Sequence, residues 1–203
     1  MANAAAADRK AANLIDRGLA LIDSFRRFFA PEPYEPTALR PSAVDWVCVG
    51  VLSIVAAAIA WIGPTLFVEK VYTSGLGSYF SSDPERVFAV LSDANSVHHH
   101  RVLVHPIFSL VTYPPAQLLM AIGLDVVQAG TLLLVIAAVL TAALFYFSLR
   151  AMSLSTLGAT AFTSSLIASA GFIHWYSFVE TFAFSGLTIS IMLFVLTAVK
   201  STP

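Results

Sequence analysis

The chain has 203 residues, of which 58% are hydrophobic and only 11% are charged, and its mean hydropathy is +0.80. An average soluble domain is about 45–50% apolar and about 25% charged, so the composition predicts a membrane protein rather than a soluble one. The net charge of -1 and the lack of a Lys/Arg stripe interleaved with aromatic residues argue against a nucleic-acid partner. With a single cysteine, Cys48, the chain has neither an internal disulfide nor a thiolate metal cluster.

The amino-terminal region predicts an amphipathic helix that lies on the membrane surface. Between Arg9 and Phe29 the apolar residues recur at steps of three and four, and most charged residues fall on the other side of the helix. A helix docked on a partner protein would show the same pattern, so that alternative stays open. Four prolines between Pro31 and Pro41 then prevent a continuous helix. We therefore assign residues 1–43 to a cytoplasmic amphipathic helix and an extended proline-rich linker.

Residues 44–203 are expected to form the transmembrane domain, because they contain four or five apolar runs close to the ~20 residues that a spanning helix needs. Four runs are clear: 44–68, 126–149, 154–173 and 178–199. The fifth, 102–123, is broken by Pro106 and by Pro114 and Pro115, so it is either a kinked span or a re-entrant segment. The expected fold class is an all-α, polytopic helical bundle in the membrane.

The distribution of positive charge predicts the orientation. Six Lys and Arg residues precede the first span, which places the amino terminus in the cytoplasm, and we expect a bacterial inner membrane as the location. The polar segment 69–101 is then an extracytoplasmic loop. If 102–123 crosses the membrane, Arg150 lies outside; if it folds back, Arg150 lies inside, and His174 and Glu180 share a side with the loop. The charge bias favours the second arrangement.

The extracytoplasmic loop and its end carry most of the residues that could do chemistry. Four of the five histidines fall within eight positions, close to three carboxylates, and this mixture of side chains binds Zn²⁺, Mn²⁺ or a similar divalent ion. These residues are Asp83, Glu85, Asp93, His98, His99, His100 and His105. Three consecutive histidines cannot all point the same way, so His98 and His100 are the candidate metal ligands. The alternative is a solvated polar cap on a membrane helix.

Glu180 stands near the start of an apolar run, where an ionised carboxylate is costly unless it is paired or hydrated, so it is a candidate functional residue. The alternative is a residue at headgroup level that seals the helix end together with Trp175 and Tyr176. Asp125 and Gln128, at the entry to the run 126–149, are typical of a helix start.

Three motifs, in this order along the chain, carry a family resemblance. They are Tyr79-Phe80-Ser81-Ser82-Asp83-Pro84-Glu85, His105-Pro106-Ile107-Phe108-Ser109-Leu110 and Val179-Glu180-Thr181-Phe182. Together they resemble the amino-terminal part of the GT-C superfamily, the integral-membrane glycosyltransferases that use polyprenyl-phosphate sugars, over roughly residues 44–199. The resemblance implies that Asp83 or Asp93 acts as a general base or metal-orienting acid, with Glu180 lining the same cavity.

The resemblance also implies that Arg101 and His105 bind the lipid phosphate, while a divalent ion, if present, steadies the leaving group. Members of that superfamily resemble one another over many more spans, so we expect a truncated relative without autonomous catalysis. The alternative is a non-catalytic accessory subunit of a larger membrane complex, energy-transducing or photosynthetic, whose partners are membrane lipids and other subunits. A channel or transporter is a third option, which is supported only by the break at Pro114 and Pro115.

Overall fold

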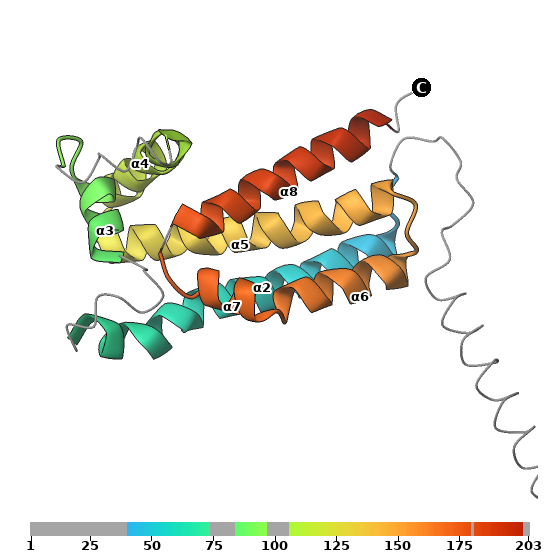
Figure 1. Cartoon of the computed structure of the whole chain (residues 1–203), viewed down its shortest axis with the longest axis horizontal. Helices are drawn as coiled ribbons and strands as arrows, with labels where there is room; N and C mark the ends of the chain where they lie inside the picture. The colour runs from blue at the N-terminus through green and yellow to red at the C-terminus, as the bar shows by residue number, and fades with distance from the viewer. Residues whose placement is uncertain (1–39, 74–83, 97–105, 180, 201–203) are drawn as a thin grey trace, which may run out of the picture.

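A computed structural model of the chain describes residues 40–73, 84–96, 106–179 and 181–200, and within these residues every regular element is a helix (Figure 1). The helices are α2 (Ala43–Thr73), α3 (Pro84–Ser92), α4 (Pro106–Ala121), α5 (Val126–Ala151), α6 (Thr156–Ile167), α7 (Ala170–Trp175) and α8 (Thr181–Lys200). The all-α class is confirmed. The predicted amino-terminal amphipathic helix and most of the linker lie outside the described residues.

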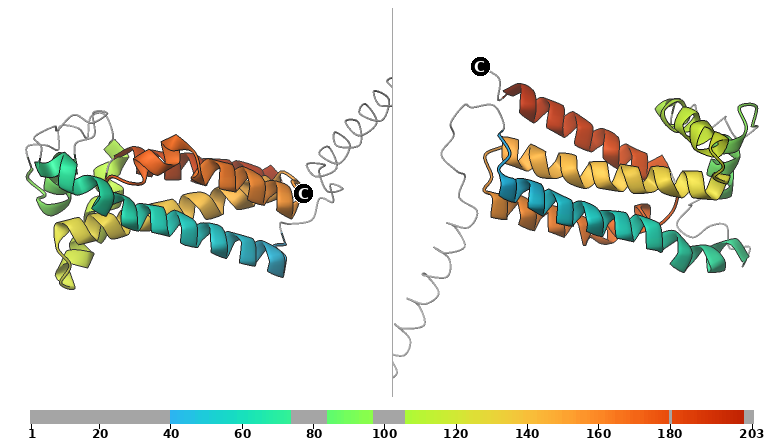
Figure 2. Two further views of the ribbon diagram at one scale, coloured as in Figure 1. Left: turned by 90° about the horizontal axis from the view of Figure 1, so that it is seen from below. Right: turned by 180° about the vertical axis from the view of Figure 1, so that it is seen from behind.

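Three of these helices are long and apolar enough to cross a membrane: α2 over Ala43–Pro64, α5 over Val126–Ala151 and α8 over Thr181–Ala198. The helix α5 lies between α2 and α8 and packs against both (Figures 1 and 2). Its apolar segment is accordingly 44% buried, against 28% in α2 and 22% in α8. The class of membrane helical bundle is therefore confirmed, but the expected four or five spans are three in the described part of the chain.

The predicted span 154–173 is not one helix, because it breaks at Ser169. The Ser169 hydroxyl accepts a hydrogen bond from the Phe172 amide at 3.1 Å, which makes Ser169 the N-cap of the short helix α7. The same hydroxyl donates to the Leu166 carbonyl at 2.7 Å near the end of α6. Helices α6 and α7 together run back beside α2 (Figure 1), but each alone is too short to span.

The segment 102–123 does not cross the membrane either. Its helix α4 has only 16 residues. At the other end of the bundle, Arg150 Nε lies 2.9 Å from Asp45 Oδ1, so α5 ends where α2 begins. The chain between α2 and α5 therefore leaves and re-enters the bundle at one end. We call the two ends the Asp45 end and the α3–α4 end, and the folded-back alternative is the one that the structure shows.

Small residues let the central helices approach closely. Ala56 and Ala60 of α2 and Ala137, Ala138 and Ala142 of α5 are all at most 1% exposed, as expected where membrane helices pack backbone to backbone. Helix α2 has 31 residues and is about 46 Å long, which exceeds the ~30 Å hydrocarbon core. The apolar segment of α2 ends at Pro64, and the helix continues to Thr73, past residue 69 where the loop was predicted to start.

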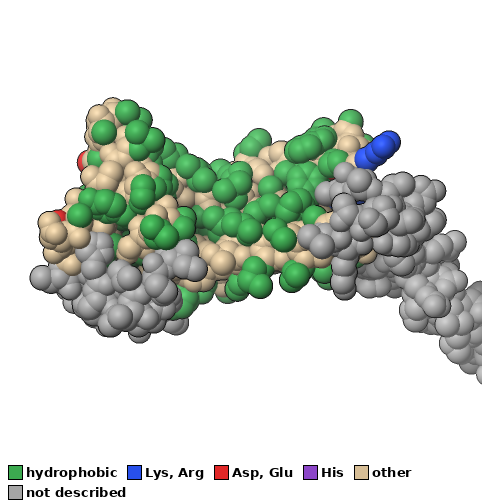
Figure 3. Space-filling view, turned by 90° about the horizontal axis from the view of Figure 1, so that it is seen from above, with side chains coloured by type: hydrophobic (Ala, Val, Ile, Leu, Met, Phe, Trp, Pro, Cys, Tyr) green, Lys and Arg blue, Asp and Glu red, His purple; other side chains and the backbone are tan. Residues whose placement is uncertain are grey.

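Apolar side chains cover the outside of the bundle between its two ends. Figure 3 shows them spread over the visible face, with acidic side chains at one end and basic ones at the other. Among the most exposed of these side chains are Ile54 on α2 and Ile189 on α8, which are 70% and 67% exposed. A soluble protein rarely exposes so continuous an apolar surface, which fits contact with lipid.

Candidate functional site

Most residues that the sequence marks as chemical lie outside the described residues. These are Asp83, Glu180, Arg101, His105, His98 and His100. Among the residues that are described, no group of three or more His, Cys, Asp and Glu side chains could hold a metal ion. The described candidates are Asp93 and His174.

Asp93 lies on the surface directly after α3 and shapes the turn that ends this helix. Its Oδ1 accepts from the Asn95 amide at 2.8 Å, and its carbonyl accepts from the Ser96 amide at 3.2 Å. This is an Asx turn, in which the side chain replaces a backbone acceptor. The Asp93 residue is exposed, so it is reachable from outside the bundle.

The α3–α4 end brings together segments that are far apart in the sequence. A Cβ atom on Gly130 of α5 would lie 2.9 Å from Phe88 Cε1 and 3.4 Å from Leu91 Cδ1, both on α3, and 3.2 Å from Val179 Cγ1. A larger residue at this position would require these side chains to shift. The residue before Glu180 and the helix that follows Asp83 are therefore packed on the same spot of α5.

Helix α4 is tied to the same end by two contacts. Gln117 Nε2 donates to the Leu91 carbonyl at the end of α3 at 2.8 Å. The rings of Phe108 on α4 and Phe184 on α8 meet edge to face with their centroids 5.3 Å apart. The described neighbours of the predicted chemical residues thus belong to one end of the bundle.

His174 also lies on this side of the bundle, in the last turn of α7. Its ring packs against Trp175 at 4.6 Å and Phe178 at 5.3 Å between centroids. The neighbouring Tyr176, which one of the two alternatives for Glu180 placed at headgroup level, is only 4% exposed. Its hydroxyl donates to the Ala183 carbonyl at 3.0 Å and lies 2.7 Å from Thr141 Oγ1, so Thr141 is the donor in that pair.

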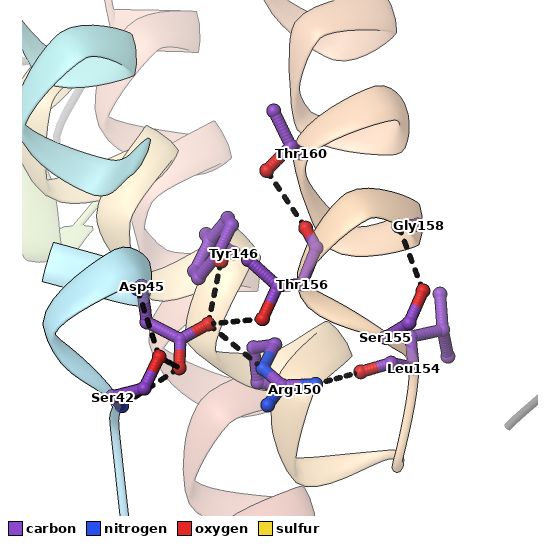
Figure 4. A network of polar contacts seen from close by, with 9 residues as sticks. All are labelled: Ser42, Asp45, Tyr146, Arg150, Leu154, Ser155, Thr156, Gly158 and Thr160. Atoms are coloured by element: carbon purple, nitrogen blue, oxygen red, sulfur yellow. Dashed lines mark hydrogen bonds and ion pairs between the residues drawn. The ribbon is translucent and has the colours of Figure 1, made fainter. Parts of the chain in front are cut away.

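The Asp45 end holds a group of polar side chains around the buried Asp45 and Tyr146, which we call the polar cluster (Figure 4). Its members are Ser42, Asp45, Tyr146, Arg150 and Thr156. Asp45 is at its centre and is 0% exposed. Its Oδ1 accepts from the Tyr146 hydroxyl at 2.7 Å and from Thr156 Oγ1 at 3.0 Å, and Arg150 Nε lies 2.9 Å away. Its Oδ2 accepts from the Ser42 amide at 2.8 Å and hydroxyl at 2.7 Å.

The polar cluster connects helices and is not a reactive site. Each carboxylate oxygen of Asp45 already meets at least two donors from the chain, and the charge is balanced by Arg150, which also donates to the Leu154 carbonyl. The Asp45 amide donates back to Ser42 Oγ at 3.1 Å, which completes a capping box at the start of α2. The cluster therefore connects α2, α5 and the start of α6.

The sequence analysis did not find the polar cluster, although local signals were present. Asp45 and Arg150 are charged residues within the apolar segments Ala43–Pro64 and Val126–Ala151, and such residues are commonly paired. Ser42, three positions before Asp45, has the spacing of a capping box. What no local pattern supplies is the pairing, because the partners are about 100 residues apart in the chain, as the separation of 101 between Asp45 and Tyr146 shows.

No protein-family model, curated protein or solved structure matches this chain. The fold and the exposed apolar surface define its class as a polytopic helical membrane protein. What it does in the membrane has to be argued from the arrangement at its two ends.

Proposed function

We propose that the chain is a membrane module that binds a lipid-linked phosphate at its α3–α4 end, in the manner of the amino-terminal part of a polyprenyl-phosphate-sugar glycosyltransferase and without autonomous catalysis. The observation that carries this proposal is the folded-back path between α2 and α5. Because of it, the described segments that adjoin Asp83, His105 and Glu180 in the chain belong to one end, which supports a single site there.

The roles follow from the side-chain chemistry. Arg101 and His105 bind the phosphate, because a guanidinium and an imidazolium are its natural hydrogen-bond donors. Asp83 or Asp93 corresponds to the acid that accepts the proton of an acceptor hydroxyl in the enzymes of that superfamily, with Glu180 lining the same cavity. If a divalent ion is bound, His98 and His100 would hold it, and it would neutralise charge on the phosphate.

Charge supports an orientation in which the α3–α4 end is extracytoplasmic in a bacterial inner membrane. Arg40 and Arg150 lie at the Asp45 end, and the Lys and Arg residues of 1–39 precede it in the chain. Labelling tests this orientation in a Cys48→Ser background. A membrane-impermeant thiol reagent should reach Asp93→Cys from outside the cell and Met152→Cys only after the membrane is opened. Labelling of both from the same side would overturn the orientation.

Binding of undecaprenyl phosphate to the full chain in nanodiscs tests the function. We expect the double variant Arg101→Ala/His105→Ala to weaken binding by at least about a hundredfold, since each charge-assisted hydrogen bond contributes about 1.5–3 kcal/mol and about 1.4 kcal/mol corresponds to a tenfold change. The matched control is Arg40→Ala, which removes an exposed charge at the opposite end and should leave binding unchanged. Equal affinity for the neutral polyprenol, or for the double variant and the wild type, would refute the proposal.

A second candidate function, an accessory subunit of a larger membrane complex, is favoured by the weak packing of α8. Only 22% of its apolar segment is buried, and its outer face exposes Ile189, Met192 and Leu196. If a partner helix covers this face, mild detergent should preserve a stoichiometric complex, and Met192→Trp should dissociate it. The matched control is Ile54→Trp on the outer face of α2. A monodisperse single chain, unaffected by Met192→Trp, would exclude this function.

A further inference from the structure

Helix α4 has two distinct faces, although no residue in it is charged. One face packs on the protein: Thr112 and Ala116 are 1% and 0% exposed. The other face is open and apolar, with Leu110, Leu118 and Ile122, just past the helix end, exposed by 75%, 67% and 70%. Steps of four residues keep these side chains on one side of the helix. In water, so open an apolar stripe would be unfavourable.

Both ends of α4 lie at the same level of the bundle. Near its start, Phe108 touches Phe184, which is in the first turn of α8. Its other end passes through a tight turn, with Gly123 at φ 104°, into the first residue of α5, Val126. From Phe108 to the end of the helix the axis rises by about 20 Å. A spanning helix would separate its ends by this distance along the membrane normal, whereas α4 begins and ends beside the first turns of two spans.

The helix therefore lies across the bundle. In the left view of Figure 2, α4 runs transverse to the long axis that α2 and α5 follow. The three candidate spans fix the direction of the membrane normal, so a helix transverse to them is parallel to the membrane plane. Its position beside Val126 and Phe184 is the level where the apolar segments of α5 and α8 begin.

We propose that α4 is an in-plane membrane anchor, whose Leu110, Leu118 and Ile122 face inserts into the lipid boundary of the leaflet at the α3–α4 end. Interfacial helices bury such faces about 5–10 Å below the headgroups, between polar heads and acyl chains. The occupant of this face is the bilayer and not another chain, because the helix lies beside the first turns of two spans, where these spans leave the hydrocarbon. The inference does not depend on the proposed function.

Depth-dependent quenching tests this inference on the full chain, with one chain per nanodisc and Cys48→Ser as background. An environment-sensitive fluorophore is attached to Leu118→Cys, and the nanodiscs contain lipids with a nitroxide either near the carbonyl or near the end of the acyl chain. The matched controls are Ile54→Cys, exposed near the middle of the α2 span, and Asn95→Cys in the polar turn after α3.

We expect the shallow nitroxide to quench the label at position 118 at least about twofold more strongly than the deep one, as a depth of about 5–10 Å requires. The label at position 54 should show the reverse order, and the label at position 95 should respond to neither lipid. Quenching at 118 that matches position 54 would mean that α4 spans the membrane. Quenching by neither lipid would mean that water or protein covers this face. Either result overturns the inference.

Discussion

The polar cluster gives the sharpest quantitative test of the fold, through the variant Asp45→Ala. The substitution removes the acceptor of the hydrogen bonds from Tyr146, Thr156 and Ser42, and the ion-pair partner of Arg150. Hydrogen bonds between membrane helices contribute about 0.6 kcal/mol each on average, so those from Tyr146 and Thr156 give about 1 kcal/mol. The loss of the cap that Asp45 forms with Ser42 adds about 1 kcal/mol. The Arg150 side chain is only 15% exposed, and leaving its charge unpaired adds to this loss.

We therefore expect Asp45→Ala to lower the free energy of unfolding by about 2–4 kcal/mol. Unfolding in mixed micelles, followed by the helical circular dichroism signal, measures this change. The matched control is Ser190→Ala, since the buried Ser190 hydroxyl donates only to the carbonyl one turn earlier in α8, at 3.0 Å. It should change the unfolding free energy by less than about 0.5 kcal/mol.

The double variant Asp45→Ala/Arg150→Met separates the ion pair from general damage. Removing both charges leaves no unpaired charge, so the double variant should be more stable than the sum of the two single changes predicts, by about 1–3 kcal/mol. If the two changes add to within about 0.3–0.5 kcal/mol, the contact at 2.9 Å does not couple the helices. In that case the reasoning about the polar cluster is wrong.

Three further predictions concern single positions and use the same unfolding measurement. Gly63→Ala should lower the free energy of unfolding by about 1–3 kcal/mol, because its Cβ would lie 2.8 Å from the Ser177 Cα. Its control, Gly50→Ala, has no atom within 4 Å of the new Cβ and should raise the free energy of unfolding by about 0.5–1 kcal/mol. Ser153→Gly should also raise it by about 0.5–1 kcal/mol, because Ser153 lies just after α5 with φ 66°, a backbone region that favours glycine; an unchanged stability would refute this. Tyr176→Phe should cost about 1 kcal/mol by removing two buried hydrogen bonds, and no loss would mean that they do not join α5 to α8.

Those elements that are set by local signals could be predicted from the sequence. The run 126–149 corresponds to α5 at Val126–Ala151, and Asp125 and Gln128 form the capping box that starts it, with bonds of 2.8 Å and 3.0 Å. Composition alone predicted the membrane class, because no soluble fold can bury so many apolar residues. In both cases the information lies within one helix or in the chain as a whole.

The break at Ser169 could not be predicted, because a serine in an apolar run has two uses. Ser165 stays inside α6 and donates to the Ala161 carbonyl at 2.9 Å, whereas Ser169 caps the next helix. The choice between them depends on contacts made elsewhere. The turn after α7 is held by Tyr176, bonded to Thr141 and Ala183, and by the close approach of Ser177 to Gly63.

The sequence predicted the residue types of the candidate site, but it could not predict where in the fold they belong. The pattern of 102–123 allowed both a span and a folded-back segment, and the choice between them decides on which side of the membrane Arg150 lies. The contact between Arg150 and Asp45 shows that α5 ends beside the start of α2, and this contact joins residues that no periodicity relates. Long-range pairing is the kind of information that a single sequence carries least well.

The two ends of the bundle differ in how their polar side chains are paired and exposed, and a pair of substitutions can test whether the two ends act separately. At the Asp45 end, the oxygens of the buried carboxylate are taken up by donors of the chain itself, so this end has the properties of a joint. At the α3–α4 end, Asp93 is exposed, and the proposed phosphate ligands precede α4 in the chain. Substitution of Asp45 by Asn should therefore lower stability while leaving the affinity for undecaprenyl phosphate unchanged below the unfolding midpoint, and Arg101→Ala should do the opposite. Distant sites without shared partners give additive effects, so a joint loss of stability and affinity in both variants would show that the ends act through α5 as one unit.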